Sequence, residues 1–368
     1  VGRFLDPKLS LQKRRKMDQV TRPIKVVINT RDRGYRLKTW VAYLGVFTLL
    51  AGDAVRYSLG WWGWGVLLVA LLISTAALFV TNKPLETLKL TPWPLTALLV
   101  LMLASAVWSA YPAFTLLATF SQLATSLFGF FLANRFDWRG LLRIFANVVR
   151  FVLITSLAFE LFAAVVIRGP IAPIFGNFDG EVPPADAYYW TQGNLFDGER
   201  IQGIQGNSNL LAYTAMLGLV LFSVELAIVS VNRSLGIASF LLAVGALLLA
   251  KSAGIGFALV AITLATAVSL AAEGHDRATR HRYYRIAWGL AAVGAFFVLA
   301  FRQTVFDLLG KSPDMTGRTG IWEKVLQLAV QQPLEGWGWI SHWVPGVEPY
   351  EGLVVIDNVP YYQAHNAY

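Results

Sequence analysis

The chain has 368 residues, of which 56% are hydrophobic and only 14% are charged, and its mean hydropathy is +0.53. A soluble domain carries about 25% charged residues, so this composition excludes an ordinary soluble protein and predicts an all-α polytopic membrane protein. There are no cysteines, which excludes disulfides, thiolate nucleophiles and cysteine-based zinc or iron–sulfur sites.

The net charge of +9 is concentrated at the N-terminus. Residues 1–39 hold twelve Lys/Arg and three Asp, so their net charge equals that of the whole chain. A basic tail can bind nucleic acid, but beside a first membrane helix it favours a role in topology and contact with anionic membrane lipids. We therefore expect residues 1–38 to be a cytoplasmic tail and expect no nucleic acid among the partners. Because the chain begins at Val1, we also expect it to be part of a longer protein.

Nine apolar stretches approach the roughly 20 residues that cross a bilayer. They cover residues 39–57, 61–81, 92–108, 112–133, 141–167, 207–231, 234–250, 254–272 and 284–301. The sequence thus predicts five spans over 39–167 and four over 207–301. With the basic tail inside, the short loops that carry Lys and Arg all lie on the inner side, as the positive-inside rule requires. Residues 168–206 and 302–368 then form two extracytoplasmic segments.

Each extracytoplasmic segment has a net charge of −3, so neither attracts anions in general. In the second segment an amphipathic helix is predicted from apolar residues at helical spacing, namely Trp322, Val325, Leu326, Ala329 and Val330. Thr319 is a candidate N-cap and Pro333 ends the pattern. We expect Arg318 just before this helix, where a guanidinium and free backbone N–H groups can share one anion. The alternative is a solvated or headgroup-facing arginine.

His365 lies near the end of the same segment and precedes Asn366. An imidazole there can accept a proton near neutral pH, as a general base must. The alternative is a structural histidine.

Residues 199–209 (ERIQGIQGNSN) join the first extracytoplasmic segment to the sixth span. Arg200 precedes a glycine-containing turn, and Asn207 or Asn209 fits the N-cap of the following helix. In the functional interpretation Arg200 is a second phosphate ligand and the helix N-terminus is an added anion site. In the structural interpretation the asparagines are caps alone.

Among the ionisable residues within the spans or at their ends, Arg150, Glu160, Glu225 and Lys251 are functional candidates. We expect Arg150 and Glu225 to lie near the inner ends and to extend toward water. We expect Glu160 to be the most buried and to pair with an arginine of another span. The sequence shows no Walker motif, metal-ligand cluster or G-x-S-x-G motif, so neither a metal nor a cofactor is expected.

Taken in order, these motifs resemble the O-antigen ligase and O-antigen polymerase family. The resemblance rests on RTGIW at 318–322, PLEGWG at 333–338, HNAY at 365–368, the 200–209 stretch, and Lys251-Ser252-Ala253-Gly254, where lysine replaces a more usual arginine. It covers residues 200–368 specifically and the rest only by helix count.

The resemblance implies a GT-C-like glycosyltransferase of the bacterial inner membrane with an extracytoplasmic active site. Such an enzyme moves a glycan from undecaprenyl diphosphate to a glycan, lipid or protein acceptor without metal or nucleotide sugar. Arg200 and Arg318 would then hold the diphosphate and His365 would activate the acceptor hydroxyl. The implied supporting residues are Asn207, Asn209, Lys251, Trp322 and Asn366. The helices that close the site in the family would follow Tyr368.

Four alternatives stay open. Two of them share the family's motifs, namely a repeat-unit polymerase and a ligase for teichuronic-type or protein-linked glycans. A lipid-linked glycan transporter without chemistry would carry polar residues along a path through the spans, and no continuous chain of carboxylates is seen there. A structural or sensory membrane protein would not need paired arginines and a histidine on one face.

Overall fold

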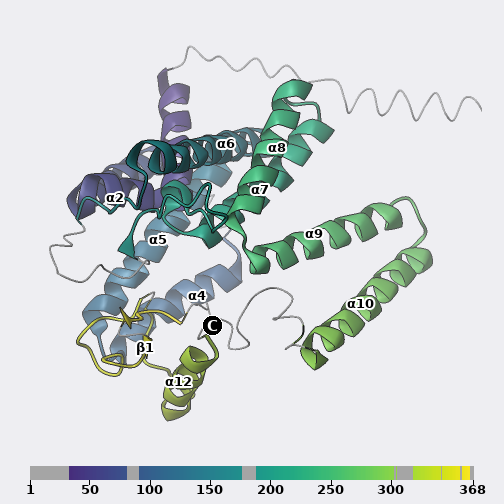
Figure 1. Ribbon diagram of the computed structural model, residues 1–368. Helices are drawn as coiled ribbons and strands as arrows, with labels where there is room; N and C mark the ends of the chain where they lie inside the picture. Colours follow the sequence, from purple (N-terminus) through teal and green to yellow (C-terminus); the bar gives the residue numbers. More distant parts are fainter. Residues whose placement is uncertain are drawn as a thin grey trace, which may run out of the picture. The chain divides into compact units, whose positions relative to one another are not determined.

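The structure, a computed structural model, describes residues 33–80, 91–175, 188–301, 304, 318–340, 342–356 and 359–364. Almost all of the regular structure in these residues is helical (Figure 1). The exception is a short antiparallel pair in which β1 (Val355–Ile356) bonds to β2 (Val359–Pro360). The chain divides into two units, one of residues 1–71 with 135–252 and one of residues 72–134 with 253–368. Each unit is described by itself.

The first unit contains most of α2 (Arg33–Val80) and four further helical elements. These are α6 (Trp138–Phe162) with its π-helical end η2 (Ala163–Ile167), the 3-10 turn η4 (Gly203–Gln205), α7 (Ser208–Ala227) and α8 (Arg233–Ala250). The helices α6, α7 and α8 pack against one another. A small residue allows this approach, because a Cβ added at Gly218 would come within 3.0 Å of Val149 and 3.4 Å of Ala243.

The second unit contains the end of α2 and the remaining helices. They are α4 (Trp93–Ala104), the 3-10 turn η1 (Ser105–Val107), α5 (Pro112–Arg135), α9 (Ala253–Ala272), α10 (Arg277–Ala300) and α12 (Arg318–Gln331). The helices α9 and α10 pack together as a hairpin (Figure 1). Asp276 begins α10, because its carboxylate accepts the backbone N–H groups of Ala278 and Thr279.

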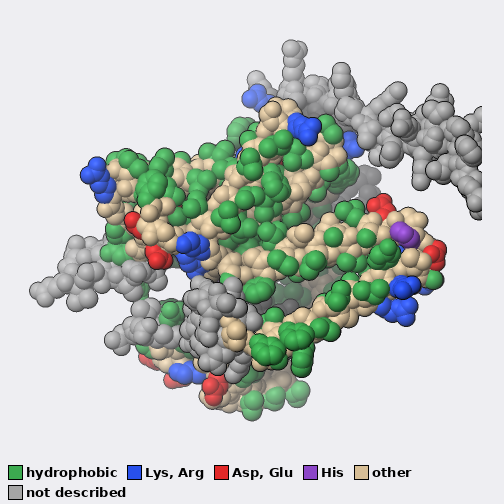
Figure 2. Space-filling model, turned by 45° about the vertical axis from the view of Figure 1, so that its right-hand side comes forward, with side chains coloured by type: hydrophobic (Ala, Val, Ile, Leu, Met, Phe, Trp, Pro, Cys, Tyr) green, Lys and Arg blue, Asp and Glu red, His purple; other side chains and the backbone are tan. Residues whose placement is uncertain are grey.

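Six helices in the described part of the chain are long and apolar enough to cross a membrane. They are Tyr35–Val80, Pro112–Arg135, Trp138–Ile167, Ser208–Ala227, Arg233–Ala250 and Ala253–Ala272. Hydrophobic side chains cover much of their outer surface, whereas acidic, Arg and His side chains gather at the turn between α9 and α10 (Figure 2). These features confirm an all-α, multi-pass membrane protein.

Three elements differ from the nine expected spans. The stretches 39–57 and 61–81 both fall in α2, whose backbone leaves the helical region at Ala51 and again at Gly60, where φ is 71°. The stretch 92–108 is the 12-residue α4 followed by a single 3-10 turn, which is short for a span. The stretch 284–301 lies almost entirely in α10, which is not among these six helices. The count of nine therefore stays a prediction. Of the basic tail at residues 1–38, the structure describes only residues 33–38, which lie at the start of α2.

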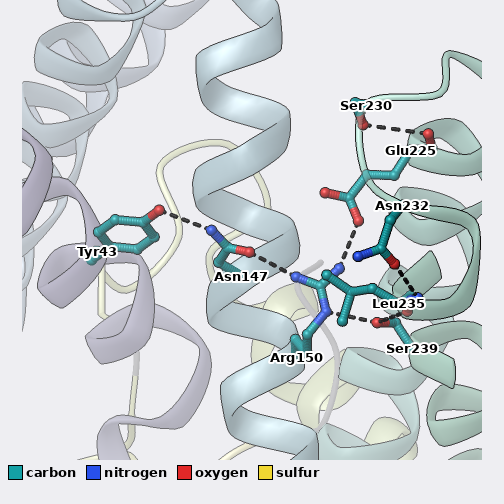
Figure 3. A network of polar contacts seen from close by, with 8 residues as sticks. All are labelled: Tyr43, Asn147, Arg150, Glu225, Ser230, Asn232, Leu235 and Ser239. Atoms are coloured by element: carbon teal, nitrogen blue, oxygen red, sulfur yellow. Dashed lines mark hydrogen bonds and ion pairs between the residues drawn. The ribbon is translucent and has the colours of Figure 1, made fainter. Parts of the chain in front are cut away.

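A buried ion pair joins the helices of the first unit (Figure 3). Arg150 on α6 donates from Nη2 to Glu225 on α7 at 2.7 Å and from Nε to Ser239 on α8 at 2.7 Å. Its Nη1 donates to Asn147 at 2.7 Å, and the Asn147 amide donates to the Tyr43 hydroxyl on α2 at 3.0 Å. The two charged side chains are only 12% and 2% exposed. The expectation that both extend toward water is wrong, because each satisfies the other inside the helix packing.

Candidate functional site

Glu160, near the end of α6, anchors the polar segment that leads into α7. Its side chain is fully buried. One carboxylate oxygen accepts the backbone N–H groups of Gln202 at 2.9 Å and Gly203 at 2.6 Å, and the other accepts the Thr191 hydroxyl at 2.8 Å. The expectation that Glu160 pairs with an arginine is wrong. Glu160 forms no ion pair with any described residue, and these three donors satisfy its carboxylate instead.

The glycines of this segment are fixed by close packing. Gly203 and Gly206 both have φ near +62°, a conformation that favours glycine. An added Cβ would lie 2.7 Å from Ser156 at the first position and 2.6 Å from the Tyr57 ring at the second. The sequence predicted the turn, and the structure shows that its backbone lies directly against α6 and α2.

Arg200 is held at both sides of its guanidinium. Its Nε donates to the Ala250 carbonyl oxygen at 3.1 Å, and its Nη2 donates to the Asn209 side-chain oxygen at 2.7 Å. The same Asn209 oxygen accepts the Ser252 hydroxyl at 2.9 Å, and the Lys251 ammonium donates to the Gly198 carbonyl oxygen. We call Arg200, Asn209, Lys251 and Ser252 the Arg200 cluster.

The Arg200 cluster contains the charged N–H donors that are typical of oxyanion sites. Partial burial lowers the pKa of Arg200 from its ordinary value, but a guanidinium keeps its charge at neutral pH. The Nε–H of Arg200 donates to Ala250 and one Nη2–H donates to Asn209. Its Nη1 donates to none of the described residues. Lys251, the C-cap of α8, adds a second positive charge. The half-buried position of Arg200 strengthens its interaction with an anion relative to a fully solvated arginine.

Asn207 is the N-cap of α7, as predicted. Its side-chain oxygen accepts the backbone N–H groups of Asn209 at 2.9 Å and Leu210 at 3.3 Å. These two N–H groups are therefore already satisfied. An anion-binding role for the α7 N-terminus stays a prediction, and it would require the Asn207 side chain to be displaced.

Arg318 is the first residue of α12, and its side chain is half-buried. It forms no hydrogen bond or ion pair with the described residues. Thr319 lies inside the helix, so the expectation that it is the N-cap is wrong. The apolar residues of α12 are divided between two faces, because Ile321 is 2% exposed whereas Leu326 and Val330 are 64% and 77% exposed.

The 333–338 turn packs on the connection between α4 and α5 in the second unit. The Trp108 indole donates to the Glu335 carbonyl oxygen at 2.7 Å, and the Tyr111 hydroxyl donates to that of Gly338 at 3.2 Å. Gly338 has φ of 98°, and a Cβ there would lie 2.5 Å from Ser109. The predicted end of the amphipathic helix at Pro333 is confirmed, because α12 ends at Gln331. The residues that receive the turn carried no recognisable signal in the sequence.

His365 and Asn366 lie outside the described residues. The residue before them is nevertheless tied to α12, because the Trp322 indole donates to the Ala364 carbonyl oxygen at 3.0 Å. Trp322 is one helical turn after Arg318. Trp322 thus contacts the chain immediately ahead of His365, and its supporting role in a site stays a prediction.

The predicted site residues thus fall into two groups. Arg200, Asn207, Asn209 and Lys251 come together in the first unit, and Arg318 lies near Trp322 in the second unit. A single site that contains both arginines stays a prediction. Sequence reasoning missed the roles of Glu160 and Ser252, whose partners come from other segments of the chain.

No protein-family model, no curated protein and no solved structure matches this chain. Among the residues that the structure describes, no group of three or more His, Cys, Asp or Glu side chains is placed to hold a metal ion.

Proposed function

We propose that this protein is a membrane glycosyltransferase of the O-antigen ligase type, which transfers a glycan from undecaprenyl diphosphate to the hydroxyl group of an acceptor. The observation that carries the proposal is the Arg200 cluster. It holds a half-buried guanidinium by two hydrogen bonds and leaves Nη1 for a ligand, with the Lys251 ammonium on the neighbouring segment. This is the chemistry that binds a diphosphate.

In the proposed reaction, the acceptor oxygen attacks the anomeric carbon while the bond from that carbon to the diphosphate oxygen breaks. Negative charge develops on the leaving diphosphate, and fixed positive groups stabilise that charge without reorganising. Arg200 and Lys251 supply such groups, and Arg318 is proposed as the second arginine. Together they take the part that a divalent cation plays in many soluble glycosyltransferases.

His365 is the proposed general base. As the acceptor hydroxyl attacks, the imidazole takes its proton, which then leaves to solvent after the transfer. Attack opposite to the leaving diphosphate inverts the configuration at the anomeric carbon. The hydrogen bond from Trp322 to Ala364 supports this role, because it restrains the residue next to His365.

The proposed topology has nine spans in a GT-C-like arrangement in the bacterial inner membrane. The N-terminus is cytoplasmic, and residues 168–206 and 302–368 are extracytoplasmic. The distribution of Lys and Arg among the short loops supports this orientation. It places Arg200, Arg318 and His365 on the side of the membrane where lipid-linked glycans are joined to acceptors.

The test is transfer by the purified full-length protein, supplied with a lipid-diphosphate-linked glycan and candidate acceptors without metal. We expect Arg200→Ala to lower the transfer rate by about 100-fold or more, as the loss of a fixed charge-stabilising donor does. Arg168→Ala is the matched control, because Arg168 is an exposed arginine at the end of η2 outside the Arg200 cluster.

The products also distinguish the alternatives. Glycan on a separate acceptor indicates a ligase, and a longer glycan still on the lipid indicates a polymerase. Movement of the lipid-linked glycan across vesicle membranes with no new glycosidic bond would identify a transporter. Equal transfer by the Arg200→Ala protein and the unmodified protein would contradict the assignment of the diphosphate site.

A further inference from the structure

The Glu160 carboxylate connects two parts of the segment that carries Arg200. Thr191 lies nine residues before Arg200, and Gln202 and Gly203 follow it closely. All three donate to the same buried side chain, at distances between 2.6 and 2.9 Å. The segment on both sides of Arg200 is therefore fixed to one point on α6.

The geometry leaves these donors no other partner of equal quality. Glu160 is 0% exposed and Gly203 is buried, so water does not replace the carboxylate. A buried backbone N–H without an acceptor is costly, and Gly203 has no side chain that could supply one. The contacts continue to α8, because the Ile201 N–H donates to the Leu249 carbonyl oxygen at 3.3 Å, next to the Ala250 oxygen that accepts from Arg200.

We propose that Glu160 is a positioning residue for Arg200, and that it fixes the loop so that the guanidinium meets Ala250 and Asn209 and presents Nη1 to the diphosphate. This inference rests on the proposed function. In this arrangement both carboxylate oxygens of Glu160 are buried acceptors of hydrogen bonds from the loop. Its effect on the reaction passes through the orientation of Arg200.

Two substitutions at Glu160 distinguish the effect of the loop geometry from the effect of the carboxylate charge. In Glu160→Gln, the remaining oxygen can accept from Gln202 and Gly203 and the amide can donate to the Thr191 hydroxyl, so the loop geometry is kept without the charge. In Glu160→Ala, all three acceptor contacts are lost. We expect Glu160→Ala to weaken binding of undecaprenyl diphosphate about tenfold, the effect of a net loss of one or two hydrogen bonds. Glu160→Gln should bind nearly as well as the unmodified protein.

A double-mutant cycle tests whether Glu160 acts through Arg200. Binding of undecaprenyl diphosphate to the full-length protein is measured for Glu160→Ala, Arg200→Ala and the double variant, together with their thermal unfolding. We expect Glu160→Ala to cause no further loss of affinity when Arg200 is already absent. A purely structural role would lower the unfolding temperature in both backgrounds but would not make the affinity loss depend on Arg200.

Thr191→Val provides a milder variant if Glu160→Ala does not fold. It removes one of the three donors and should weaken binding by a smaller factor. Its matched control is Thr155→Val on α6, whose hydroxyl donates to the Phe151 carbonyl oxygen within the same helix. We expect the control to bind as the unmodified protein does.

The outcomes distinguish the two proposals. If Arg200→Ala binds undecaprenyl diphosphate with unchanged affinity, the proposed function fails. If Arg200→Ala weakens binding while Glu160→Ala and Thr191→Val do not, only the positioning role fails. An affinity loss of the same size from Glu160→Ala in both backgrounds also overturns the positioning role, because Glu160 would then act without Arg200.

Discussion

Arg200 donates to Asn209 at 2.7 Å, and this contact links a loop residue to the second residue of α7. The Asn209 oxygen also accepts the Ser252 hydroxyl, so it joins the loop, α7 and the residues that follow α8. An asparagine oxygen is neutral. It therefore orients the guanidinium without cancelling its charge, which leaves that charge available to an anion.

The first prediction concerns this oxygen. Asn209→Ala removes one hydrogen bond to a charged group, whose net contribution is about 1.5–3 kcal/mol. We therefore expect the affinity for undecaprenyl diphosphate to fall by about tenfold or more. Asn209→Asp should also weaken donor binding, because the new carboxylate pairs with Arg200 and repels the diphosphate. The measurement is binding of undecaprenyl diphosphate, and equal affinity for the Asp variant and the unmodified protein would contradict the role of Arg200.

Asn207→Ala is the comparison for this prediction. Asn207 caps α7 and does not contact Arg200. Loss of an N-cap costs about 1 kcal/mol of stability, so we expect this variant to unfold at a lower temperature. Its stability change should exceed that of Asn209→Ala, whereas its affinity change should be the smaller of the two.

The second prediction concerns the pair of Arg150 and Glu225. Removal of one partner leaves an uncompensated buried charge, so Arg150→Ala or Glu225→Ala should destabilise the protein by about 3–5 kcal/mol. The double variant Arg150→Met with Glu225→Leu should recover much of this loss, because no buried charge remains. Thermal unfolding in detergent measures the difference. Single variants that unfold like the double variant would show that the two charges are not coupled.

The positions of helices could be predicted from the lengths of apolar runs in the sequence. The hydrogen-bond partners of buried polar groups could not. The expected span 234–250 is α8, Arg233–Ala250, since a run of apolar residues is a local property. The partner of Glu160 depends on which loop folds against α6. The partner of Arg150 depends on the rotation of two neighbouring helices. Neither quantity can be read from one sequence.

The candidate site shows the same difference between local contacts, which could be predicted, and long-range contacts, which could not. Asn207 was predicted as an N-cap because capping depends on residues within one turn. Asn209 was placed in the same local role, yet its side chain reaches residues 9 and 43 positions away. The residues that receive the 333–338 turn, such as Trp108 and Tyr111, are more than 200 positions from it. Such contacts exist only once the helices have packed.

The third prediction concerns alkaline pH. Burial raises the pKa of Tyr111 and of Tyr350, whose hydroxyl groups are hydrogen-bonded to each other. The folded state therefore holds protons that the unfolded state releases, so stability is present below the ordinary tyrosine pKa of about 10 and is lost as the pH rises above it.

The measurement is the thermal unfolding temperature between about pH 8 and pH 11, on either side of the ordinary tyrosine pKa. The unmodified protein should lose stability more steeply above pH 10 than Tyr111→Phe, which lacks one of the two raised groups. The comparison between the two proteins cancels the titration of the other tyrosines. Identical slopes would show that the pair does not contribute to the pH dependence.

The last prediction concerns Trp322 and the base that it is proposed to restrain. Trp322→Phe keeps an aromatic ring but loses the indole N–H and its hydrogen bond to the Ala364 carbonyl oxygen. Such a bond contributes about 0.5–1.5 kcal/mol, so kcat for transfer should fall by up to about tenfold. Trp337→Phe loses a bond of equal length, 3.0 Å, to the Leu328 carbonyl oxygen and should change kcat less. His365→Ala should remove transfer almost completely. In that background Trp322→Phe should have no further effect on the residual rate, because the residue it positions is gone. Unchanged transfer by His365→Ala would exclude His365 as the general base.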